Sequence, residues 1–157
     1  MPSAYLDALK MLARRELSEE RVRQRLARRG HPADEIDAAV ERLRAERALD
    51  DQRVAETIAR AQSLGRGRGR FRVRQEIEAA GIGRAVADRA VSEAFKDVDA
   101  SALLDAAIAR RLHGRTGPVD DREFRRLFRY LVGQGFESDR VVRALKARLG
   151  RVPDSTD

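Results

Sequence analysis

A glycine set among regularly spaced apolar residues recurs three times along this chain, and this repeat limits the possible folds more than any other feature. The three glycines are Gly30, Gly81 and Gly135. Around each of them, apolar residues follow steps of three and four, which is the spacing of one buried helix face, and no stretch alternates as a strand does. A repeat with a period of about 50 residues is typical of proteins whose units bury their apolar faces against one another. The sequence therefore predicts an all-α protein made of tandem repeats.

Each repeat is predicted to contain three helices, and the three repeats are predicted to form an elongated, curved array. The expected domain boundaries are 4–49 for the first repeat, 50–98 for the second and 99–149 for the third. Residues 150–157 are expected to form a flexible tail.

Polar residues and glycines mark where the helices are expected to begin and end. Ser18, Asp50 and Asp120 can each accept a hydrogen bond from a free backbone N–H in the first turn of a helix. Asp120 also precedes Glu123 at capping-box spacing, and Pro32 suits the first position of a helix. The repeat glycines suit the left-handed conformation that ends a helix. The predicted core positions include Val22, Leu26, Ile36, Val40, Leu43, Val54, Ile58, Ala61, Leu127, Leu131, Val141, Leu145 and Leu149.

The composition excludes several classes of protein. The 157 residues include no cysteine, which excludes disulfides, thiolate metal sites and cysteine nucleophiles. No apolar run approaches the roughly 20 residues of a membrane-spanning helix, and residues 1–10 lack the pattern of a secretory signal. We expect a cytoplasmic, monomeric protein that binds no metal and no cofactor and does not associate with a membrane.

The chain is strongly basic, with 33 lysines and arginines against 26 acidic residues and a formal net charge of +7. Only Lys10, Lys96 and Lys146 are lysines, so arginine supplies almost all of the positive charge. Two interpretations stay open. The arginines reflect the codon usage of a GC-rich genome, or they form a surface that binds nucleoprotein, because guanidinium groups match phosphate and carboxylate geometry.

The strongest functional signal is a run of five arginines with no acidic residue between Arg60 and Glu76: Arg66, Arg68, Arg70, Arg72 and Arg74. Such a concentration of like charge indicates an anionic partner, either nucleic acid or an acidic groove of a protein. The alternative is a solvated basic loop. Gly65, Gly67 and Gly69 predict a flexible first half, but no Lys-Ser/Thr pair follows and no strand precedes, so the segment is not a nucleotide-binding loop.

Further arginines fall on the expected second helices of the first and third repeats. They either extend a basic binding surface or form a solvated face paired with acidic residues. These candidates are Arg25, Arg28, Arg29, Arg125, Arg126 and Arg129.

Acidic and histidine residues show no catalytic arrangement. Two pairs of neighbouring aspartates, at 50–51 and 120–121, stand where helices begin, so helix capping explains them better than metal binding or acid–base chemistry. His31 and His113 lack the spacing of metal ligands. His31 directly follows a repeat glycine, where we expect a half-buried contact that closes the helix end. No enzymatic activity is predicted.

Several short motifs resemble the RecX family of bacterial regulatory proteins. They are the Leu49-Asp50-Asp51 junction, the basic turn followed by residues 73–82 (VRQEIEAAGI), Ser18 at the start of a second helix, and the Gly135-Phe136 pair. Their order and spacing match the family pattern over roughly residues 4–149.

The resemblance implies a function that the composition and periodicity do not. Proteins of this family bind the RecA recombinase in the helical groove of its DNA filament and suppress its ATPase, strand-exchange and coprotease activities. They thereby restrain recombination and the SOS response. Direct binding to single- or double-stranded DNA is compatible with this role. The alternatives are a basic DNA- or RNA-binding module that acts without RecA, and a helical scaffold for another protein.

Overall fold

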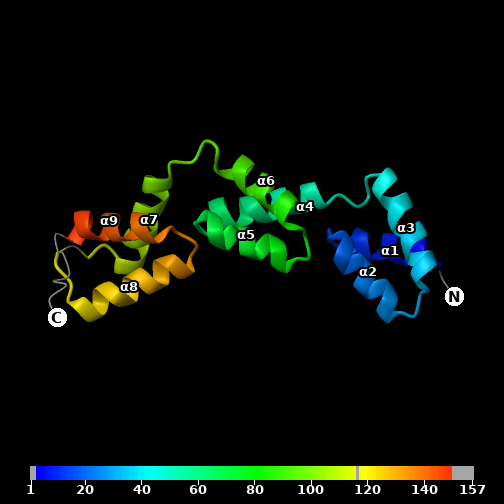
Figure 1. Ribbon diagram of the computed structural model, residues 1–157, viewed down its shortest axis with the longest axis horizontal. Helices are drawn as coiled ribbons and strands as arrows, with labels where there is room; N and C mark the ends of the chain where they lie inside the picture. The colour runs from blue at the N-terminus through cyan, green and yellow to red at the C-terminus, as the bar shows by residue number, and fades with distance from the viewer. Residues whose placement is uncertain (1–2, 116, 150–157) are drawn as a thin grey trace. The chain divides into compact units, whose positions relative to one another are not determined.

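The computed structural model describes residues 3–115 and 117–149, and these residues form helices and no β-strand (Figure 1). The all-α prediction is therefore confirmed. A π-helical turn, Ala61–Gly65, follows the fourth α-helix directly. The predicted tail over 150–157 lies outside the described residues. The α-helices are α1 (Ala4–Arg14), α2 (Glu19–Arg28), α3 (Ala33–Ala45), α4 (Asp51–Arg60), α5 (Arg70–Ala79), α6 (Arg84–Phe95), α7 (Ala100–Leu112), α8 (Asp121–Gly133) and α9 (Ser138–Leu149).

Two compact units make up the fold, and each draws on separate stretches of the chain. Unit 1 contains the described residues up to Ala59 together with Glu76–Ala90. Unit 2 contains Arg60–Gln75 together with the described residues from Val91 onward. The helices α5 and α6 are therefore divided between the units. The three repeat boundaries expected from the sequence stay a prediction, because this division follows spatial contacts rather than the sequence repeat.

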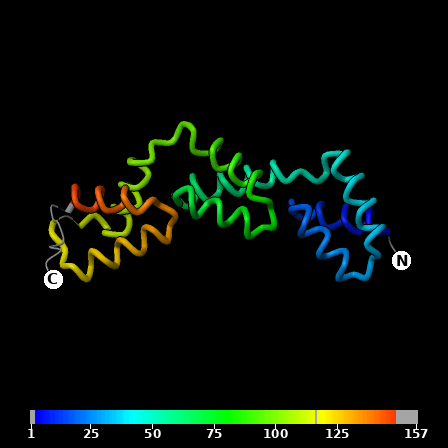
Figure 2. The backbone as a smooth tube through the Cα atoms, in the orientation of Figure 1, coloured from blue at the N-terminus to red at the C-terminus, as the bar shows by residue number. Residues whose placement is uncertain are grey.

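The helices α1, α2 and α3 enclose the core of unit 1, and Figure 2 shows them side by side in the N-terminal part of the backbone trace. Val22 and Leu26 of α2 and Val40 and Leu43 of α3 are fully buried. Complete burial of such an aliphatic side chain contributes about 1.5–3 kcal/mol relative to exposure. The apolar faces predicted for α2 and α3 are therefore confirmed.

The helices α7, α8 and α9 enclose the core of unit 2 in the same way. Ile108 and Leu112 of α7 meet Leu131 of α8 and Leu145 of α9, and all four side chains are buried. The predicted core positions on α8 and α9 are confirmed, except that the side chain of Leu149 lies outside the described part of the chain.

The buried face of α4 differs from the prediction by a rotation of the helix. Val54 is buried as expected, but the next buried positions are Ala55 and Ala59. Ile58 is half-buried and Ala61 is exposed. The buried face of α4 therefore follows Ala55 and Ala59, which are four residues apart and lie on the same side of the helix, and Ala61 falls outside it.

Helix caps follow the local rules of the sequence. Ser18, Asp50 and Asp120 each accept a hydrogen bond from the backbone N–H three residues further on, at 3.2, 3.1 and 2.8 Å. The carboxylate of Glu123, which the capping-box spacing directs toward Asp120, accepts instead from the Arg115 guanidinium at 2.6 Å. The predicted caps are therefore confirmed. In place of the second hydrogen bond of a capping box, Glu123 forms an ion pair with Arg115.

The repeat glycines end their helices in the left-handed conformation. The φ angles of Gly30, Gly81 and Gly135 are +88°, +90° and +98°, which glycine adopts without a steric penalty. Pro32 lies one position earlier than predicted, before the first residue of α3, with extended backbone (φ −65°, ψ 152°).

His31 is buried, with 7% of its surface exposed, so the expectation of a half-buried contact is wrong. Its Nε2–H donates to Asp7 Oδ2 over 2.7 Å, because an ionised carboxylate can only accept. The guanidinium of Arg29 lies 3.3 Å from the other oxygen of Asp7. The position after a repeat glycine favours an apolar residue. A histidine can occupy it here because the buried carboxylate of Asp7, in α1, pairs with the imidazole.

This cluster predicts a loss of stability in acid. The hydrogen bond from His31, assisted by the charge of Arg29, holds the pKa of Asp7 below its ordinary value of 3.8. A lowered carboxyl pKa stabilises the fold above the pKa of the unfolded chain, and this stabilisation is lost as the pH falls through the folded pKa. We expect Asp7→Asn to destabilise the protein at neutral pH, and this difference from the parent to shrink as the pH falls below about 4.

Urea unfolding at a series of pH values measures this difference. The control is Glu41→Gln, which removes an exposed carboxylate from α3. A destabilisation by Asp7→Asn that stayed constant from neutral to acid pH would contradict the assignment.

The turn between α5 and α6 packs on the first residues of α2. The Ser18 hydroxyl donates to the carbonyl of Ala80 over 2.5 Å, and the Arg21 guanidinium donates to the carbonyl of Ala79 over 2.7 Å. Ser18 therefore caps its own helix and also holds a turn that lies far along the chain. We call this contact the first junction.

Candidate functional site

The basic segment, residues 66–74, follows the π-helical turn and continues into α5. The backbone N–H groups of Arg66, Gly67 and Arg68 donate to carbonyls of the turn over 3.0–3.1 Å. Gly67 and Gly69 are buried. Backbone hydrogen bonds therefore give the segment a defined path, and the flexibility predicted from its glycines stays a prediction. A π-helical turn is rare and is often found next to a functional site.

The turn between α8 and α9 packs on the start of α5. The N–H of Gly69 donates to the carbonyl of Gln134 over 2.8 Å, and the N–H of Phe71 donates to the carbonyl of Gly135 over 3.2 Å. A Cβ at Gly69 would lie only 2.5 Å from the Gly135 carbonyl oxygen. Only glycine allows two backbones to approach this closely. We call this contact the second junction, and it fixes the position of the basic segment in unit 2.

The two junctions are built alike. Ser18 and Gly69 each stand directly before the helix that receives the turn, and Ala80 and Gln134 each stand directly before a repeat glycine. A side-chain hydroxyl makes the contact in the first junction, and a backbone N–H makes it in the second. The sequence repeat therefore corresponds to a repeated tertiary contact.

All five arginines of the basic segment belong to unit 2. Two of the side chains, Arg66 and Arg70, are exposed. The guanidinium of Arg70 lies 5.6 Å from the centre of the Phe95 ring, and that of Arg74 lies 5.8 Å from the centre of the Phe71 ring. These distances are within the range of cation–π attraction. The half-buried arginines of the segment are Arg68, Arg72 and Arg74.

Arg110 adds a further cation to the basic segment, although the sequence did not single it out for binding. A Cβ at Gly67 would overlap the Arg110 guanidinium, so this exposed side chain of α7 lies directly against the segment. The guanidinium of Arg68 donates to Gln62 Oε1 over 2.7 Å. No local sequence pattern connects Arg110 with residues so far away, and only the tertiary structure reveals the contact.

Arg25 and Arg28 of unit 1 line a cavity of about 250 Å³ beside the first junction, together with Arg15 and Arg21. One carboxylate, that of Glu16, also lines this cavity. The structure therefore places two of the predicted arginines in a second basic cluster, which belongs to unit 1.

The remaining arginines predicted for binding occupy other settings. Arg29 pairs with Asp7 and belongs to the buried histidine cluster. The arginines of α8 are exposed, and none of their described contacts joins them to the basic segment: Arg125, Arg126 and Arg129.

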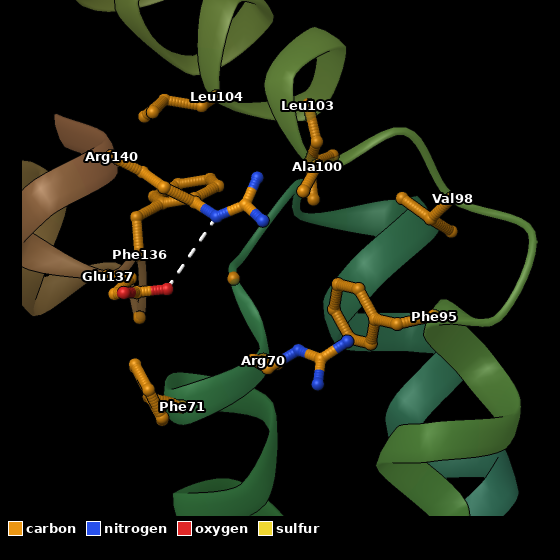
Figure 3. A pocket seen from close by; sticks show the side chains of 12 residues that line it. Arg70, Phe71, Phe95, Val98, Ala100, Leu103, Leu104, Phe136, Glu137 and Arg140 are labelled. Carbon is orange, nitrogen blue, oxygen red and sulfur yellow. Dashed lines mark ion pairs between the residues drawn. The ribbon is translucent and has the colours of Figure 1, made fainter. Parts of the chain in front are cut away.

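A cavity of about 230 Å³ lies beside the second junction, and the basic segment forms part of its wall (Figure 3). The side chains of Arg70 from α5 and Arg140 from α9 lie at this cavity. Arg140 pairs with Glu137 at 3.6 Å. The cavity thus combines a positively charged rim with an apolar lining. The apolar side chains that line it are Phe71, Phe95, Val98, Ala100, Leu103, Leu104 and Phe136.

Three of the four aspartates in the two pairs accept hydrogen bonds from backbone N–H groups at the starts of helices. Besides the caps at Asp50 and Asp120, the Asp51 carboxylate accepts from the backbone N–H of Glu19 over 2.9 Å. Burial raises the pKa of Asp51 above its ordinary value. Over residues 3–115 and 117–149, no three His, Cys, Asp or Glu residues are grouped so that they could hold a metal ion. None of the helices described here is long and apolar enough to cross a bilayer.

Known protein sequences resemble this chain over most of its length. The domain described as "RecX, first three-helix domain" matches residues 4–43. A regulatory protein RecX from Halorhodospira halophila is 37% identical over 141 residues, which cover 89% of this chain and 84% of that protein. A regulatory protein RecX from Acidithiobacillus ferrooxidans is 33% identical over 141 residues, which cover 89% of this chain and 87% of that protein.

Solved structures show the same fold. The crystal structure of RecX from Lactobacillus salivarius has a TM-score of 0.75 and 17% identity, and the match covers 92% of this chain and 93% of that one. A second crystal structure, of a regulatory protein RecX, has a TM-score of 0.72 and 20% identity, and the match covers 92% of this chain and 70% of that one. At these identities the likeness establishes the fold alone.

Proposed function

Because this chain belongs to the RecX family of regulatory proteins, we propose that it is a negative regulator of the RecA recombinase. It binds in the groove of the RecA–DNA filament and inhibits the ATPase, strand-exchange and coprotease activities of RecA. It thereby restrains recombination and SOS DNA repair. It acts in the cytoplasm as a monomer, by binding rather than by catalysis.

Membership of the RecX family carries this proposal, and the basic segment supports it with a binding surface. Arg66 and Arg70 are exposed, no acidic residue interrupts the segment, and Arg110 adds a neighbouring cation. A filament wound on DNA offers phosphates as well as acidic side chains, and guanidinium groups bind both through paired hydrogen bonds. Concentrated positive charge also accelerates association with an anionic partner.

The other basic residues support contacts with more than one site on the filament. A protein that holds one filament through several weak contacts gains affinity, because the later contacts form at a high effective concentration. We assign the basic segment to the main contact. Weaker contacts are assigned to Arg25, Arg28, Arg29, Arg125, Arg126 and Arg129.

The proposal is tested by ATP hydrolysis. RecA is assembled on single-stranded DNA, the protein is added below the RecA concentration, and the hydrolysis rate is followed. We expect inhibition at substoichiometric protein, because one bound molecule interrupts a filament of many subunits. Hydrolysis that stays unchanged even at an excess of protein would contradict the proposal.

A DNA- or RNA-binding module acting without RecA is the second candidate, and the basic segment favours it too. If all five arginines met phosphates of a single strand, the logarithm of the affinity would change with the logarithm of salt concentration with a slope near −3.5, at about −0.7 for each contact. Salt-sensitive binding to nucleic acid without any effect on RecA would support this candidate.

A further inference from the structure

We propose that the cavity beside the second junction receives an apolar side chain of a protein partner, and that a carboxylate on the same partner segment pairs with Arg70. This inference rests on the proposed function, in which that partner is the RecA filament. It adds the chemistry of one contact, because it requires a partner segment that carries an apolar side chain and a nearby carboxylate.

The size and lining of the cavity suit a single side chain. Its volume of about 230 Å³ is below the roughly 300–1,000 Å³ of sites that enclose small molecules. Phe71 stands at the cavity with 43% of its surface exposed. Single exposed apolar residues are common on proteins, but this one adjoins the apolar wall formed by Leu103 and Leu104 (Figure 3). An inserted apolar side chain would remove the exposed part of Phe71 and the wall from water.

The charge at the rim selects an acidic partner. Arg140 has a carboxylate nearby, that of Glu137 at 3.6 Å. Arg70 is exposed and packs on Phe95, and within the part of the chain that the structure describes no carboxylate pairs with it. A carboxylate beside the inserted side chain would match this charge with two parallel hydrogen bonds.

The aromatic rings favour a protein segment over a nucleic acid. Proteins that bind single strands stack the bases on exposed aromatic faces. Two of the three rings here, Phe95 and Phe136, are each only 7% exposed, so they offer no stacking surface.

Binding of the full-length protein to RecA filaments on single-stranded DNA, measured by biolayer interferometry, tests the inference. We expect Phe71→Ala to weaken binding about tenfold, because anchors of an interface lose at least this much on truncation. Phe71→Leu should retain most of the affinity, since it keeps an apolar side chain. Arg70→Glu should weaken binding more than Arg66→Glu, which reverses a neighbouring exposed charge of the same segment.

The matched controls lie in unit 1. Leu6→Ala truncates another exposed apolar side chain, 50% exposed, and Arg84→Glu reverses another exposed charge. Both should bind the filament as the parent does. Phe71 and Arg70 are exposed, so their variants should also keep the melting temperature of the parent.

Four outcomes overturn the inference or its premise. If the parent binds the filament and Phe71→Ala binds it equally tightly, the inference is overturned and the proposed function stands. If Phe71→Ala loses as much affinity for single-stranded DNA without RecA as for the filament, the cavity binds nucleic acid instead. Dissociation of a parent dimer by Phe71→Ala, seen in sedimentation, assigns it to a second copy of the chain. A parent that does not bind the filament overturns the proposed function itself.

Discussion

Replacing Gly135 with alanine is expected to lower the free energy of unfolding by about 2–5 kcal/mol. Two effects combine at this position. Its φ of +98° is left-handed, which costs an L-residue about 1–2 kcal/mol. A Cβ would also overlap the backbone nitrogen of Arg72 across the second junction, and crowding that displaces packed groups costs about 1–3 kcal/mol.

Two other glycines separate these effects. Gly30 has a left-handed φ of +88° but open space where a Cβ would stand, so Gly30→Ala should cost only about 1–2 kcal/mol. Gly69 has no left-handed φ but is crowded by the Gly135 carbonyl, so Gly69→Ala should cost about 1–3 kcal/mol. Gly133 has neither constraint, and Gly133→Ala should be neutral or slightly stabilising.

Urea unfolding followed by circular dichroism gives the four free energies. If Gly135→Ala cost no more than Gly30→Ala, the close contact at the second junction would contribute nothing to stability. If Gly133→Ala cost as much as Gly30→Ala or Gly135→Ala, neither the left-handed backbone nor the crowding would explain the losses.

Replacing Arg66, Arg68 and Arg70 together with alanine is expected to raise the concentration needed for half-inhibition of RecA ATPase at least about tenfold. The three side chains carry the proposed main contact, and two of them are exposed. If they meet phosphates of a single strand, the salt dependence of binding should also flatten by about 2 units of slope, at about 0.7 for each. The melting temperature should stay close to that of the parent, because Arg66 and Arg70 are exposed and the side-chain hydrogen bond that is lost joins Arg68 to Gln62.

The control removes the same amount of charge elsewhere. Arg84, Arg89 and Arg148 are exposed and lie outside the basic segment, and their joint replacement with alanine should leave inhibition nearly unchanged. Equal losses in the two triple variants would indicate that net charge alone governs binding. Unchanged inhibition in the first variant would remove the basic segment from the site.

Features that depend on near neighbours in the chain could be predicted from the sequence. Ser18, Asp50 and Asp120 cap helices because a short polar side chain reaches the N–H three residues on, whatever the rest of the fold does. Gly30 and Gly135 end helices because the left-handed conformation excludes most other residues. The buried faces of α2, α3, α8 and α9 follow in the same way from helical periodicity.

Features that depend on distant residues could not be predicted. The contacts of Gly69 and Phe71 with the turn at Gln134 and Gly135 could not be predicted, because this turn comes more than 60 residues later. The burial of His31 was underestimated because its partner, Asp7, lies 24 residues away, and no sequence motif around Asp7 indicates the pairing. The cation that Arg110 adds to the basic segment was missed for the same reason. The basic segment was found from its composition, whereas the cavity beside it arises only when three separate stretches of chain meet.

The junctions also predict an order of events in folding. The bond from Ser18 to Ala80 links residues 62 positions apart, and closing a loop of that length costs roughly 4 kcal/mol of chain entropy. Contacts between adjacent helices close much shorter loops and form first. We therefore expect the second junction, which closes a loop of similar length, to form late, so that the basic segment reaches its final position only after that step. A partner that recognises the positioned segment would bind the completed fold and exclude the intermediates that precede it.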